Sequence, residues 1–198
     1  MGVARARDLE ARGVCRPLLR TMHREGTVRT LARGVYCLPG YTPSESQAMA
    51  LVAARASSAV FCLVSALRLH GMEDAVALAR GVNPTVPTPW IALPPTARVP
   101  LLPQCRLRVV RMSGPLLAAG VQERVVDQVR VRLFSPAKTV VDCFRFRGRP
   151  GLGVPVAVAA LREFLKLHPG EDARDELRRH AALARMATVM RPYLEALA

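Results

Sequence analysis

The chain has scattered cysteines, almost no lysine and no uninterrupted hydrophobic run, and each shortage excludes a class of protein. Five cysteines occur in 198 residues without a CxxC pair, and the four histidines show no ligand spacing. This pattern excludes a disulfide framework and a zinc site. The longest apolar stretch, residues 48–67, is interrupted by Arg55 and by serines, and Met1–Arg12 carries charges of both signs. We therefore expect a cytoplasmic protein with no membrane span, metal or other cofactor.

The motifs of common enzymes are missing as well. The sequence has no glycine-rich phosphate loop, no HExxH and no GxSxG. Cys62, Cys105 and Cys143 lie in apolar runs, which favours packing over nucleophilic catalysis. His70 has no acid partner in its motif, so a hydrogen-bonding role is expected rather than general-base catalysis. Lys138 and Asp142 lie one helical turn apart and predict an ordinary surface ion pair, not a metal nuclease site. The prediction is a protein without enzymatic activity.

Positive charge is abundant and unevenly distributed. The net charge is +14, and 27 of the 29 basic residues are arginine. Residues 1–40 carry eight basic and three acidic residues, a net charge of +5. Residues 105–154 carry ten and three, a net charge of +7, whereas the segments 41–104 and 155–198 are each at +1. Basic proteins are attracted to nucleic acid, to acidic proteins or to anionic membrane surfaces, and here the positive charge lies in two separate blocks.

The first block has the element order of a winged helix-turn-helix. Residues 4–12 predict a short helix ended by Gly13, and residues 15–25 a second helix ended by Gly26. Residues 27–38 then predict a β-hairpin with its turn at 32–34. In this fold the second helix enters the major groove and the hairpin contacts the backbone or minor groove. A further helix normally precedes these two, and only three residues are available for it.

The outer side of this unit is rich in arginine. Val14, Leu18, Leu19 and Met22 are expected to face inward from the second helix. The candidate DNA-binding residues are Arg16, Arg20, His23, Arg24, Arg29 and Arg33. A solvated basic surface without a ligand remains the alternative for these side chains.

Residues 44–198 predict a second, mixed α/β domain after a breaker cluster at 39–43. A capped helix begins at Ser44, and strands are expected at 60–63, 90–93, 106–112, 121–126 and 129–134. Helices are expected at 65–71, 136–147 and 155–167, followed by a helical pair from residue 171 that breaks at Pro192. The second basic block would present Arg106, Arg108, Arg130 and Arg132 on its surface. These arginines could bind a partner or form a solvated sheet face.

Several segments together resemble the AbiEi family of antitoxins from bacterial toxin–antitoxin systems. They are RGVYCLPG (33–40), VFCLVSALRLHGM (60–72), PWIALP (89–94), SPAKTVVDCFRFR (135–147), GLGVPVAVAAL (151–161) and RPYLEALA (191–198). The SALRLHG and SPAKTVVD elements are the specific parts. Because their residues are mostly apolar or capping, they are expected to be structural framework.

The resemblance implies a winged-helix domain at residues 1–40 that represses its own operon by binding inverted repeats in the promoter. It also implies that residues 44–198 counteract a nucleotidyltransferase toxin of the AbiEii type without a stable complex, as in type IV systems. Two alternatives remain open: a stand-alone winged-helix regulator without a toxin, and an enzyme such as a nuclease built on the second domain.

Overall fold

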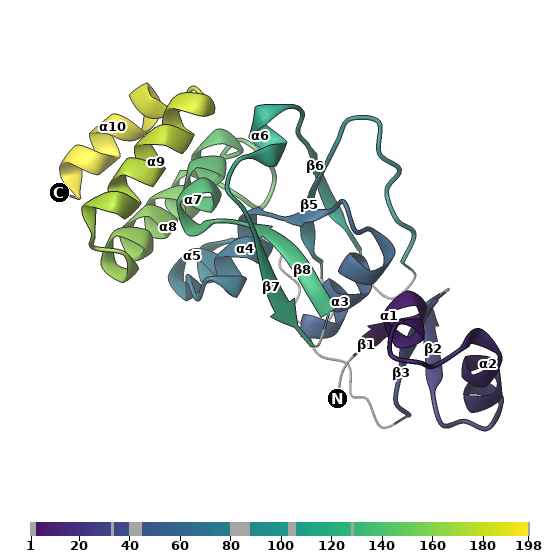
Figure 1. Cartoon of the computed structure of the whole chain (residues 1–198). Helices are drawn as coiled ribbons and strands as arrows, with labels where there is room; N and C mark the ends of the chain where they lie inside the picture. Colours follow the sequence, from purple (N-terminus) through teal and green to yellow (C-terminus); the bar gives the residue numbers. More distant parts are fainter. Residues whose placement is uncertain are drawn as a thin grey trace.

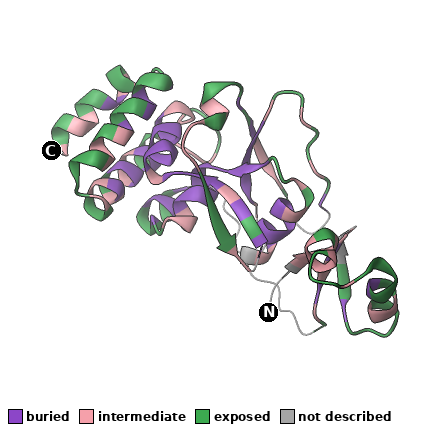
Figure 2. Cartoon of the chain, viewed as in Figure 1, coloured by how far each residue is buried: buried purple, intermediate pink, exposed green. Residues whose placement is uncertain are grey.

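The computed structural model describes residues 3–32, 34–39, 45–79, 88–102, 106–127 and 129–197. A small N-terminal unit of strands and short helices lies at one end of the molecule, and the C-terminal helices α9 (Glu171–Leu183) and α10 (Ala187–Ala196) lie at the other (Figure 1). A larger sheet stands between them. The buried residues concentrate on this sheet and on the helices beside it, whereas the N-terminal unit is mostly exposed (Figure 2).

The N-terminal unit begins with a strand. Its elements are β1 (Val3–Arg5), α1 (Ala6–Glu10), α2 (Arg16–Arg24), β2 (Arg29–Ala32) and β3 (Val35–Cys37). The strands form an antiparallel sheet of order β1-β3-β2. The predicted helix at 4–12 is therefore wrong at its start. Ala4 lies opposite Tyr36 in the ladder, so pairing with a distant strand overrides the local helical preference of this segment.

Helix α3 (Glu45–Arg55) covers this small sheet from the following part of the chain. It contacts β1 and β3. Val35 of β3, which is 1% exposed, belongs to the same apolar cluster as Met49 and Val52 of α3. The apolar surface of the small sheet is therefore buried by α3, a helix that follows the hairpin in the sequence. Residues 40–44, including the cap at Ser44, lie outside the described residues, and the division into domains at 39–43 stays a prediction.

The larger sheet has five strands among the described residues, in the order β6-β5-β4-β8-β7. Their bounds are β4 (Val60–Phe61), β5 (Trp90–Leu93), β6 (Arg108–Arg111), β7 (Val121–Val126) and β8 (Val129–Phe134). The β4–β8 and β5–β6 pairs are parallel, and the β4–β5 and β7–β8 pairs are antiparallel. The predicted hairpin of β7 and β8 is confirmed at both bounds. The chain is a mixed α/β protein, as expected.

The two faces of this sheet bury separate apolar clusters. Alternate residues of β5 belong to different clusters: Ile91 and Leu93 pack with α3, and Trp90 and Ala92 pack on the other side. The helices that contribute to this second cluster are α4 (Leu63–Leu69), α5 (Glu73–Leu78), α7 (Pro136–Arg145), α8 (Val154–Leu167), α9 (Glu171–Leu183) and α10 (Ala187–Ala196), with α6 (Pro115–Ala118) at its edge. This alternation follows from the two-residue period of a strand.

Three features of the helices differ from the prediction. Helices α5 and α6 are short and were not expected. The break between α9 and α10 lies at Ala184–Met186, where Arg185 has a φ of +56°. Pro192 lies inside α10 rather than at the break. Helices commonly end at a residue in the left-handed conformation, and the apolar periodicity of the sequence does not reveal such a residue.

The two specific motifs of the sequence meet in the interior and act as framework. His70 Nε2 donates to the carbonyl oxygen of Phe134 at 2.8 Å, which joins SALRLHG to the residue that precedes SPAKTVVD. Ser65 Oγ accepts from the backbone N–H of Trp90 at 2.9 Å. Ser135 Oγ caps α7 by accepting from Lys138 N, and it donates to Glu176 Oε1 at 2.6 Å. The hydrogen-bonding role expected for His70 is confirmed.

The predicted surface ion pair is instead fully buried. Lys138 Nζ lies 2.5 Å from Asp142 Oδ2, and both side chains are 0% exposed. The ammonium also lies 4.4 Å from the centre of the Phe134 ring, and burial raises the pKa of the Asp142 carboxyl. Gly120 closes over this site: a Cβ there would lie 3.0 Å from the side chains of Lys138 and His180. The i, i+4 spacing of Lys138 and Asp142 predicted the ion pair but not its burial. The burial depends on the packing of α4, α8 and α9 against α7.

Candidate nucleic-acid interface

Only a small part of the surface of helix α2 packs against the rest of the N-terminal unit. Pro17 stands in its first turn, where a missing N–H is harmless. Leu19 is its buried residue, at 2% exposure. The expectation that Leu18 faces inward is wrong, because this side chain is 46% exposed. A nine-residue helix on so narrow a contact leaves most of its circumference open to a ligand.

The exposed side of α2 carries a row of arginines. Arg16, Arg20 and Arg24 recur every four residues and therefore lie along one side of the helix. Arg16 Nε lies 2.6 Å from Glu10 Oε1 of α1. Arg20 and Arg24 have no ion-pair partner among the residues that the structure describes. Like charges spaced in this way destabilise an isolated helix slightly. The guanidinium groups of Arg20 and Arg24 are therefore available for hydrogen bonds to an anion such as a phosphate group.

The hairpin of β2 and β3 is tied to the end of α2. His23 Nδ1 lies 3.4 Å from the carbonyl oxygen of Val28 and 3.4 Å from Thr30 Oγ1. The contact of His23 with DNA stays a prediction, and in the structure its ring contacts the start of the hairpin. Arg29 is exposed on β2 opposite Cys37. Arg33, at the predicted hairpin tip, lies outside the described residues.

The arginines of the second basic block stand in two places. Arg108 begins β6 at one edge of the five-stranded sheet, whereas Arg130 and Arg132 lie on β8. Three strand spacings separate β6 from β8, which is about 14 Å. The Arg108 guanidinium lies 4.9 Å from the Trp90 ring and donates to the carbonyl oxygen of Pro150, and Arg106 is exposed just before β6. Arg130 and Arg132 instead line a cavity together with Arg5 and Arg7 of the N-terminal unit.

Two of the cysteines that the structure describes, Cys62 and Cys143, are unlike catalytic thiols. Cys62 and Cys143 are 0% and 1% exposed, and burial raises the pKa of both thiols. Cys105 lies outside the described residues. Within the described ranges, no three His, Cys, Asp or Glu side chains gather closely enough to hold a metal ion. None of the described helices is long and apolar enough to cross a membrane.

Comparison with known proteins assigns the N-terminal part of the chain to a family. Residues 2–78 match the family model described as "Transcriptional regulator, AbiEi antitoxin N-terminal domain". The N-terminal domain is of AbiEi type. The match confirms the resemblance seen in the sequence for this part of the chain. It extends from β1 to α5, and it therefore includes α3 and the SALRLHG motif together with the candidate interface.

The chain was also compared with curated proteins and with solved structures. None of the curated proteins matches the chain significantly. A solved structure titled "Crystal structure of RV2827C protein from Mycobacterium tuberculosis" is similar to the chain with a TM-score of 0.49 and 15% sequence identity. The alignment covers 92% of this chain and 67% of that one.

Proposed function

We propose that this protein is a DNA-binding antitoxin that represses its own operon and counteracts a nucleotidyltransferase toxin of the AbiEii type. In this proposal β1, α1, α2, β2 and β3 form a winged helix-turn-helix, with α2 in the major groove and the β2–β3 hairpin as the wing. The observation that carries the proposal is the exposed arginine row of α2 beside a hairpin, within a domain of AbiEi type.

The residues divide into two roles on DNA. Arg20 is the strongest candidate for reading a base edge, because it is exposed, it has no ion-pair partner among the described residues and it lies mid-helix. Arg16 is held partly by Glu10, and it would exchange that carboxylate for DNA. Arg29 and Arg33 of the hairpin are assigned to the phosphate backbone or minor groove, where contacts set orientation rather than sequence preference.

Operator binding is expected to depend strongly on salt. Four or five phosphate contacts each contribute about −0.9 to the slope of log K against log salt, so the expected slope is roughly −4. The measurement is a fluorescence anisotropy titration of the full-length protein on its own promoter, at several salt concentrations. A slope near zero would exclude phosphate binding by this unit. Chelators are expected to leave the affinity unchanged.

Antitoxin activity is expected to survive the loss of operator binding. The proposal assigns protection to the part of the chain from residue 44 onward, so replacing Arg20 and Arg24 with glutamate should leave it intact. The test expresses the neighbouring nucleotidyltransferase gene with the full-length wild type or this variant and counts surviving cells. If no such gene lies beside this one, or if the wild type gives no protection, the protein is a stand-alone winged-helix regulator instead.

A further inference from the structure

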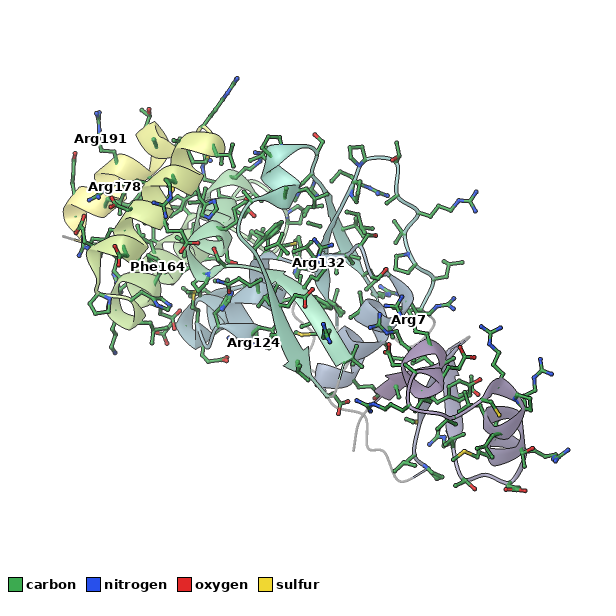
Figure 3. All side chains as sticks on the ribbon, viewed as in Figure 1. Arg7, Arg124, Arg132, Phe164, Arg178 and Arg191 are labelled. Carbon is green, nitrogen blue, oxygen red and sulfur yellow. The ribbon has the colours of Figure 1, made fainter. Side chains whose placement is uncertain are left out.

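A cleft lined by arginines lies between the N-terminal unit and the larger sheet. Its volume is about 350 Å³. One wall comes from β1 and α1, another from the β7–β8 hairpin, and the remainder from the end of α3 and the loop before β4. The lining side chains with charge are Arg5, Arg7, Asp8, Glu123, Arg130 and Arg132. Figure 3 labels Arg7, on the α1 side, and Arg132, on β8.

The cleft continues into a second cavity along α1. This cavity has a volume of about 220 Å³, shares Arg5, Asp8 and Arg130 with the first, and adds Arg12. The two cavities together bring arginines from the first twelve residues next to arginines of β8. Residues more than a hundred positions apart in the sequence thus supply one concentration of positive charge.

The carboxylates in the cleft offset only part of this charge. Asp8 serves two arginines: its Oδ2 lies 2.8 Å from Arg5 Nε and its Oδ1 lies 3.6 Å from Arg7 Nε. Glu123 Oε2 is 3.9 Å from Arg130 Nη1, at the limit of an ion pair. Arg132 has no carboxylate partner among the described residues. Four arginines against two carboxylates leave the 350 Å³ cavity with a formal charge of +2.

The shape of the cleft favours a small anion. The uncharged part of its wall consists of Ala53, Ala56, Ser57 and Ala59, whose short side chains leave room between the guanidinium groups. The volume lies within the range of pockets for small ligands, and a DNA duplex is far too wide to enter it. Arginine is the side chain best suited to phosphate, because its planar fork donates two parallel hydrogen bonds.

We propose that this cleft binds a small di- or triphosphate, either free or carried by a nucleoside. Arg7 and Arg132 supply the main contacts from opposite walls, and Arg130 exchanges its long pairing with Glu123 for the anion. The ligand joins the N-terminal unit to the larger sheet. This site is separate from the arginine row of α2 and does not depend on the proposed function in DNA binding.

The test is isothermal titration calorimetry of the full-length protein with pyrophosphate, tripolyphosphate, ATP and GTP, with adenosine as the ligand that lacks phosphate. Arg7→Ala, Arg130→Ala and Arg132→Ala are each expected to weaken binding about tenfold or more, because each removes a hydrogen bond to a charged group. Arg191→Ala, an exposed arginine of α10, is the matched control and should bind like the wild type. Equal affinity for pyrophosphate and ATP identifies the phosphates as the whole ligand, and tighter ATP binding adds the nucleoside.

Several results would overturn the proposal. These are no binding of any phosphate compound, equal weakening by Arg191→Ala, and binding of adenosine as tight as that of ATP. If Arg132→Ala fails to fold, the test uses Arg7→Ala and Arg130→Ala. The side chains of these two arginines are 64% and 77% exposed, so their removal should not affect folding. The Arg20→Glu/Arg24→Glu variant separates this proposal from the DNA-binding one, because it should bind the anion with unchanged affinity.

Discussion

Replacing Asp142 with alanine is expected to destabilise the protein by about 3–5 kcal/mol. The substitution leaves the Lys138 ammonium in the interior at 0% exposure without its carboxylate, and the Phe134 ring compensates for only part of that loss. Urea unfolding followed by circular dichroism measures the change. A loss below about 1 kcal/mol would mean that the ammonium reaches water or another acceptor when Asp142 is absent.

Two control variants test whether the loss of stability comes from leaving a buried charge without its partner. The double variant Lys138→Met/Asp142→Leu removes both charges from the same space, and it is expected to recover most of the lost stability. Glu195→Ala breaks the Arg191–Glu195 pair, which has the same i, i+4 spacing on α10 but is exposed and 3.9 Å long. That change should have no measurable effect on the urea midpoint.

Reversing the charge of Arg20 and Arg24 together is expected to lower operator affinity by about 100-fold or more near physiological salt. The double variant Arg20→Glu/Arg24→Glu removes two contacts to DNA and places two carboxylates against its phosphates. Fluorescence anisotropy on the promoter measures the loss. The matched control is Arg179→Glu/Arg191→Glu, which changes the net charge equally on the exposed surface of α9 and α10. If the control loses as much affinity, the effect is one of overall charge and α2 is not the DNA-binding element.

Single alanine variants then assign roles within the interface. Arg20→Ala should relax sequence preference, because a base contact discriminates between base pairs. Arg29→Ala should weaken binding to all sequences alike and reduce the salt slope by about 1, because a phosphate contact carries no sequence information. If Arg29→Ala instead changes the preference for particular base pairs, Arg29 of the hairpin contacts a base.

The sequence by itself determined the local elements and their order. Glycines at 13 and 26 bounded α2, Ser135 and Pro136 began α7, and the two-residue alternation of 129–134 gave β8 with its arginines outward. These features follow from backbone preferences and periodicity within a few residues. The AbiEi resemblance also followed from short motifs, and the family match confirms it for residues 2–78.

The tertiary structure alone decided which of these elements meet. Val3–Arg5 became a strand because β3 pairs with it, and α3 covers β1 and β3 although it follows a breaker cluster. Lys138 and Asp142 are buried because α4, α8 and α9 enclose α7, a fact that i, i+4 spacing does not encode. Arg7 and Arg132 line one cleft for the same reason. Burial and proximity depend on packing between segments far apart in the chain, whereas periodicity reports only the side of an element on which a residue lies.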